Sequence, residues 1–290
     1  MNSHRLSTRS IGQFSPKNWL QEGDGLFASS RKTREVWEEH RRQFSKTVAD
    51  EGQLRFPERA GDMTLLTGLP RASMLLLGYA VEMYLKAGIA KAYVGCAENM
   101  FSRDIRKRFG HHFSLMAEEL CFPLSEADRK NLERLKKMVL VDARYPVEVG
   151  ENETHASAVN NQTSRIWSKD SYDELADLVK RVNQHSRLID SDENDPANIC
   201  AFDIDQDGYL AFRVGGRLPP RITYKISSAM RANGESTTVA DIKALFHPED
   251  PRFTRILHYW DHSFIYEDGH VKQNGHVVTK CHSRPASENS

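Results

Sequence analysis

Residues 71–94, RASMLLLGYAVEMYLKAGIAKAYV, are the stretch of the chain that decides its fold. Apolar side chains such as Leu77 and Val81 occupy nearly every position, which predicts a helix that is buried on most of its faces. Glu82 and Lys86 interrupt this apolar run at a spacing of four residues, so they lie one turn apart on the same helical face. Because ion pairs in apolar surroundings need further polar partners, we expect this pair to have others. The segment therefore predicts the central helix of an all-α bundle.

The composition is that of a globular protein with a heavily charged surface. The chain has 290 residues, of which 39% are hydrophobic and 28% charged, enough for one large domain or two of ordinary size. Lys and Arg together number 40, as do Asp and Glu, so only a local patch can attract a charged partner. No charge-free apolar run approaches the length of about 18 residues that a membrane span needs. The four cysteines show no CxxC spacing, and we expect reduced thiols, a cytoplasmic location and no membrane association.

Helices are expected on both sides of the central segment. The patterns predict helices over residues 32–50, from about Pro70, over 111–120, and from a capping box formed by Ser125 and Asp128. The polar residues 147–165 are expected to form a loop. This gives the following division of the chain: a flexible arm (1–30), a helical bundle (31–190), an acidic linker (191–196), a small α+β module (197–282) and a tail (283–290).

The module begins with an alternating pattern around Gln206-Asp207-Gly208. This pattern predicts a hairpin that places Cys200, Phe202 and Ile204 on one face with Leu210, Phe212 and Val214. Helices over 224–232, 238–246 and 250–262 would complete a winged helix, with Arg252, Arg255, His258 and His262 available to nucleic acid on the third helix. The alternative is an α+β unit that packs on the bundle or mediates self-association.

Three sequence features in a fixed order carry a resemblance to a known family. They are Gly78–Ala87 (GYAVEMYLKA), the Gly110-His111 turn before the third helix, and Ala143–Pro146 (ARYP) at the end of the fourth. This succession, over about residues 60–190, resembles the HEPN superfamily of four- to five-helix domains found in prokaryotic toxin, defence and RNA-processing proteins. The resemblance implies a mainly α fold with an α+β appendage, an RNA- or nucleotide-associated function in a defence or toxin–antitoxin system, an antitoxin or defence partner, and a homodimer.

The resemblance also implies a chemistry. Many members of the superfamily are metal-independent ribonucleases that use an Arg followed by a His four to six residues later. Arg106 with His111 or His112 has this spacing, although the family motif lies at the last core helix and this pair precedes the third. A His near neutral pH moves protons at the ribose and the leaving oxygen, and an Arg stabilises charge on the phosphate. The alternative is that Gly110-His111 only starts a helix beside a solvated basic run.

Other residues are candidates for binding rather than catalysis. Arg103, Lys107 and Arg108 belong to the densest positive run and would contact phosphates, while Arg144 and Tyr145 would contact a phosphate and stack on a base. No cofactor or metal is expected, because the chain has no phosphate-binding glycine motif, HExxH or complete calcium loop. Three functions remain open: an endoribonuclease, a non-enzymatic RNA- or DNA-binding regulator, and a dimerisation scaffold.

Overall fold

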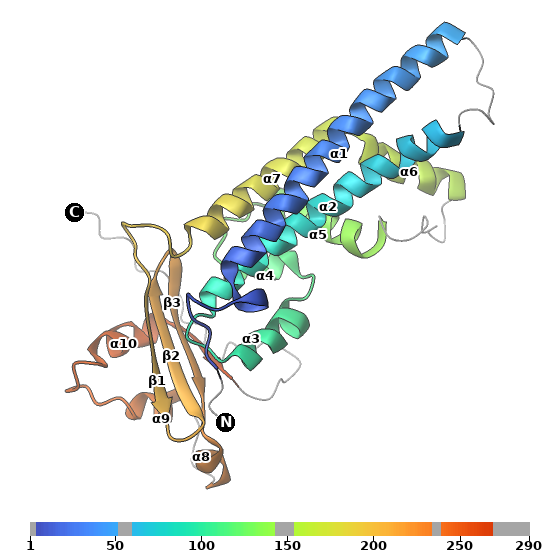
Figure 1. Ribbon diagram of the computed structural model, residues 1–290. Coiled ribbons are helices and arrows are strands. Elements are labelled where there is room, and N and C mark those ends of the chain that lie inside the picture. Colours follow the sequence, from blue (N-terminus) through green and yellow to red (C-terminus); the bar gives the residue numbers. More distant parts are fainter. Residues whose placement is uncertain (1–3, 52–59, 143–153, 234–238, 269–290) are drawn as a thin grey trace. The chain divides into compact units, whose positions relative to one another are not determined.

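The computed structural model describes residues 4–51, 60–142, 154–233 and 239–268, and it is mainly helical with one small sheet (Figure 1). The α-helices are α1 (Pro16–Glu51), α2 (Ala60–Ala92), α3 (Glu98–Asp104), α4 (Phe113–Glu119), α5 (Glu126–Lys137), α6 (His155–Trp167), α7 (Lys169–Leu188), α8 (Ser228–Ala232), α9 (Val239–Ala244) and α10 (Thr254–Tyr259). Single turns are the 3-10 helices η1 (Gly12–Phe14) and η5 (Trp260–His262) and the π-helices η3 (Ile105–Phe109) and η4 (Met138–Asp142). The strands are β1 (Asn198–Ile204), β2 (Gly208–Gly215), β3 (Leu218–Lys225) and β4 (Phe264–Glu267).

The chain forms two compact units. Residues 16–87 and 111–186 form the helical unit, and residues 1–15, 88–110 and 187–290 form the sheet unit. The acidic segment 191–196, expected to be a linker, belongs to the sheet unit. The expected bundle character is confirmed for the helical unit, where α1, α2 and α7 run side by side (Figure 1).

Helix α2 begins ten residues before the expected start, and Pro70 lies inside it. A proline has no N–H, so the carbonyl four residues earlier, that of Leu66, loses its helical donor. The indole Nε1 of Trp37 on α1 donates to this carbonyl at 3.0 Å, and the Trp37 side chain is buried. The packing of α1 against α2 therefore satisfies the group that Pro70 leaves open, and the helix continues.

Two further expectations for the helical unit were wrong. Residues 16–30, expected in the arm, are the first turns of α1. The expected loop 147–165 contains α6, which starts at the N-cap Thr154, whose hydroxyl accepts from the backbone N–H of Ser157. Buried side chains recur at a spacing of four along α6. Because one of them is polar, the sequence shows no apolar periodicity that would predict a helix. These side chains are Ala158, Gln162 and Ile166.

Gly78 on α2 marks a close approach between helices. A Cβ at this position would lie 2.6 Å from Cγ2 of Val139 and 3.1 Å from the carbonyl oxygen of Leu135. A Cβ at Gly68, on the same helix, would meet nothing within 4 Å. The two glycines therefore differ in packing but share a helical backbone.

We predict opposite effects for the two alanine substitutions. Gly78→Ala should destabilise the protein by about 1–3 kcal/mol through overpacking. Gly68→Ala should stabilise it by about 0.4–1 kcal/mol, because alanine loses less conformational entropy in a helix. Urea unfolding of both variants provides the measurement, and a stabilised Gly78→Ala variant would show that α2 and η4 do not pack closely.

The sheet unit contains a four-stranded sheet in the order β1-β2-β3-β4, with β4 parallel to β3 and the other pairs antiparallel. The predicted hairpin is confirmed, since Cys200 pairs with Phe212 and Phe202 with Leu210. Strand β3 was not predicted, and Tyr224, expected to begin a helix, lies within it. The helices expected over 238–246 and 250–262 are present in shorter form as α9 and α10.

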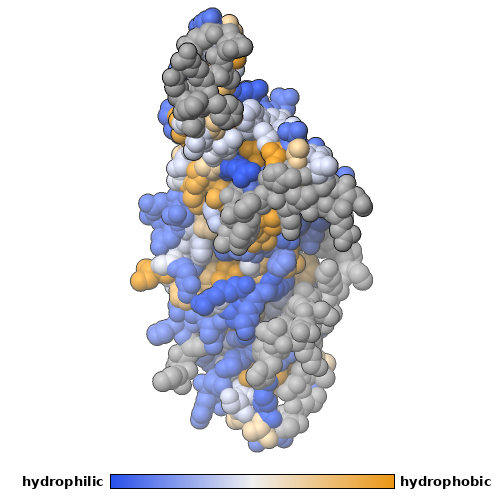
Figure 2. Space-filling model, turned by 90° about the vertical axis from the view of Figure 1, so that its right-hand side faces the viewer, coloured by the Kyte–Doolittle hydropathy of each residue, from blue (hydrophilic) through white to orange (hydrophobic). Residues whose placement is uncertain are grey.

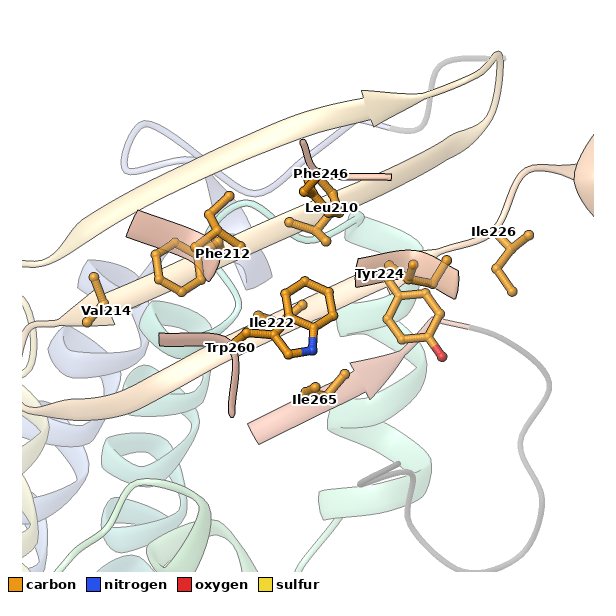
Figure 3. Close-up of a cluster of buried hydrophobic side chains, with 11 residues drawn as sticks. Leu210, Phe212, Val214, Ile222, Tyr224, Ile226, Phe246, Trp260 and Ile265 are labelled. Atoms are coloured by element: carbon orange, nitrogen blue, oxygen red, sulfur yellow. The ribbon is translucent and has the colours of Figure 1, made fainter. Parts of the chain in front are cut away.

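One face of the sheet carries the core of this unit (Figure 3). Side chains from β2 and β3, including Phe212 and Ile222, pack against Ile256 of α10 and Trp260 of η5. The opposite face contacts the segment before α3. A Cβ added at Gly95 in this segment would lie 3.3 Å from the Cβ of Ala211. Strand β2 at the centre of the sheet is thus covered on both faces within its own unit.

Helix α2 is the one helix, among those with described residues, that is long and apolar enough to cross a membrane, over Gly61–Ala92. A core helix of a globular protein has the same length and composition. Leu77 and Val81 of this helix are completely buried within the protein, as a core helix requires. Among the coloured residues of the face in Figure 2, hydrophilic areas lie beside apolar ones.

Candidate functional site

A buried carboxylate joins two basic side chains in the helical unit. Glu82 on α2 accepts a hydrogen bond from Lys86 Nζ at 2.5 Å through Oε1. Its second oxygen, Oε2, lies 3.0 Å from Nδ1 of His111, which precedes α4. The side chain of Glu82 is 3% exposed, that of Lys86 14% and that of His111 43%. The expected further partner of the Glu82–Lys86 pair is therefore His111, 29 residues along the chain.

This arrangement sets the orientation of the His111 ring. A carboxylate only accepts hydrogen bonds, so Nδ1 carries a hydrogen and donates a hydrogen bond to Oε2 of Glu82. In the neutral ring Nε2 is then the proton acceptor, on a side chain that is nearly half exposed. A carboxylate that fixes the tautomer and the orientation of the ring is the arrangement by which a histidine serves as a general base and then a general acid.

Trp19 on α1 lies next to the same cluster. The Lys86 ammonium is 5.4 Å from the centre of the Trp19 ring, within the range of a cation–π contact. Trp19 is only partly buried. The helical unit therefore brings together an aromatic ring, a cation, a carboxylate and an imidazole from three separate elements.

The predicted basic run divides into two groups within the sheet unit. Arg103 donates to Asp104 and to Asp268, each at 3.1 Å. Burial opposes the charge of this guanidinium, but the two carboxylates raise the pKa of Arg103 above its usual value. Tyr209 donates to the second oxygen of Asp268 at 3.0 Å, so Asp268 links Arg103 to the sheet. Arg103 is thus engaged within the protein.

Arg108 is engaged in a similar way, and the two residues before it are not. The guanidinium of Arg108 lies 5.3 Å from the ring centre of Tyr266 and donates to the hydroxyl of Tyr93 at 3.3 Å. Arg106 and Lys107 occupy η3 and are exposed. Of the four predicted basic residues, these two are the ones that present their side chains to solvent.

The other predicted residues have different outcomes. Gly110 ends η3 with φ +45°, as expected of a helix-breaking turn. Arg106 belongs to the sheet unit and His111 to the helical unit, so their catalytic pairing stays a prediction. His112 is exposed at the N-cap of α4. Arg144 and Tyr145 lie outside the described residues.

The sequence reasoning missed the link between Glu82 and His111. Each residue had been singled out, but the 29-residue separation carries no spacing signal. The available signal was the need of a buried Glu for a second partner, together with a histidine at the start of the next core helix. Comparisons of the chain with protein families, with curated proteins and with solved structures found no match.

Proposed function

We propose that this chain is an RNA-associated protein of the HEPN kind that cleaves RNA, with His111 as the proton-transferring residue. The observation that carries the proposal is the hydrogen bond from His111 Nδ1 to the buried carboxylate of Glu82. In this proposal Glu82 is a positioning residue, and Lys86 donates a hydrogen bond to its other carboxylate oxygen.

The reaction follows from the orientation of the ring. Nε2 of His111 takes the proton of a ribose 2′-hydroxyl, and the 2′-oxygen attacks the adjacent phosphorus. The bond from phosphorus to the 5′-oxygen breaks, leaving a 2′,3′-cyclic phosphate on one fragment. The imidazolium returns its proton to the departing 5′-oxygen, so the chemistry balances without a further reactant.

The exposed cations Arg106 and Lys107 would contact the phosphate backbone. The resemblance to the superfamily further implies that Arg106 stabilises charge on the phosphate in the transition state. It also implies the biological setting, a prokaryotic defence or toxin–antitoxin system with a protein partner. These assignments rest on the resemblance and belong to the same proposal.

An RNA cleavage assay in EDTA tests the proposal. Labelled single-stranded RNA should be cut by the purified protein near neutral pH, and the fragments should end in a 2′,3′-cyclic phosphate. DNA of the same sequence should remain intact, because it has no 2′-hydroxyl. Products with a 3′-hydroxyl, or equal cutting of DNA, would exclude this mechanism. RNA binding without cleavage would instead assign a non-enzymatic regulator.

A further inference from the structure

Strand β1 forms an edge of the sheet in the sheet unit. Within the described parts of the chain, its ladder partner is β2 alone, in an unbroken register from Asn198↔Val214 to Ile204↔Gly208. An edge strand presents a row of unpaired backbone N–H and C=O groups, and proteins usually protect it with lysine, proline, a bulge or a very short strand. The sequence of β1, NICAFDI, has seven residues, no lysine and no proline, and its pairing with β2 has no bulge.

The single charge on β1 is already neutralised. Asp203 forms an ion pair with Arg5, which also lies 5.2 Å from the ring centre of Tyr209. The Asp203 side chain remains 81% exposed, so this pair leaves the strand accessible. An approaching strand therefore meets no net charge along the length of β1.

The core face of β1 is incompletely covered. Cys200, Phe202 and Ile204 pack against the hydrophobic core of the unit but stay only partly buried. Phe202 contacts Phe253 edge-to-face, with ring centres 5.3 Å apart. A further strand beside β1 would cover the remaining apolar surface of these side chains and so continue the core.

We propose that the occupant of this edge is a second copy of the chain, paired antiparallel through β1. Full overlap of the two strands places the two-fold axis at Ala201, which then faces Ala201 of the partner subunit. Under this register Cys200 faces the partner's Phe202, and Asp203 faces the partner's Ile199. Within β1 itself no two like charges meet, and apolar side chains face each other on the core side. This self-complementarity is what a two-fold interface requires.

The consequence is a continuous sheet across two subunits. The main-chain groups of β1 in both subunits become paired, which removes the edge that each sheet leaves open among the described residues. The surface lies wholly in the sheet unit and involves neither Glu82 nor His111. The inference therefore stands or falls independently of RNA cleavage.

A charge-swap experiment tests the register as well as the dimer. Ala201 is exposed, so a longer side chain can be placed there without a buried clash. Ala201→Lys and Ala201→Glu would each set two like charges opposite one another, and each variant should sediment as a monomer where the wild type is a dimer. An equimolar mixture of the two should restore a dimer. Ala232→Lys, at an exposed alanine of α8, is the matched control and should remain dimeric.

Circular dichroism should show that all variants are folded. A monomeric wild type at high micromolar concentration would overturn the proposal and leave the edge to an extended segment other than a second copy. Dimeric Ala201→Lys and Ala201→Glu variants would overturn it as well, since the interface would then lie elsewhere. Monomeric variants that fail to associate on mixing would exclude the register centred on Ala201.

Discussion

His111→Ala is expected to lower kcat/KM for RNA cleavage by about 10²- to 10⁴-fold, the usual contribution of a general acid–base residue. The expected loss of stability is small, because the His111 side chain is 43% exposed and Glu82 keeps its bond to Lys86. The two quantities separate a catalytic role from a structural one. Initial cleavage rates in EDTA and the midpoint of thermal unfolding are the measurements.

Two comparisons sharpen this prediction. His111→Gln keeps a side-chain N–H donor in place of the imidazole, yet it cannot shuttle a proton, so its activity should fall as far as that of His111→Ala. His112→Ala decides between the two histidines of the turn, and it should retain most of the activity, since His112 is exposed at the start of α4 and Glu82 contacts His111 instead. Full activity in His111→Ala, or a greater loss in His112→Ala, would remove the role assigned to His111.

The candidate site was only partly predictable from the sequence. The spacing of Glu82 and Lys86 was sufficient to predict their ion pair, because residues four apart on a helix are neighbours. The contact with His111 depends on how α4 packs in the bundle, which no local pattern specifies. The basic run shows the same limit. Its charge was evident, but the carboxylate that engages Arg103 comes from Asp268, 165 residues later.

The fold shows where local rules were overridden by packing. Pro70 was expected to start a helix, and the start was wrong because Trp37 supplies the donor that the Leu66 carbonyl lacks. The capping box of Ser125 and Asp128 was predictable, since both partners lie within one turn. Strand β3 escaped prediction because Pro219-Pro220 near its start is unusual in a strand. Local signals therefore identified caps and hairpins, while tertiary contacts decided the rest.

Glu82→Ala is expected to lower the free energy of unfolding by about 3–5 kcal/mol, the usual result of removing one partner of a buried ion pair. The Lys86 side chain, 14% exposed, would lose its ion-pair partner and retain its contact with the Trp19 ring. Loss of the carboxylate would also release the His111 ring, so cleavage should fall as well. Urea unfolding followed by the helical circular dichroism signal measures the change.

The double variant Glu82→Met/Lys86→Met separates the effect of the ion pair on stability from the effect of the volume that its two side chains fill. Methionine has a similar length to both side chains, and an apolar replacement of a buried ion pair is often neutral or stabilising. The double variant should therefore regain most of the free energy of unfolding that Glu82→Ala loses. Cleavage should stay low, because His111 has no carboxylate partner. A loss of less than about 1 kcal/mol in Glu82→Ala would mean that water screens the pair, as at an exposed site. The role of Glu82 would then be to orient His111, with little contribution to the free energy of unfolding.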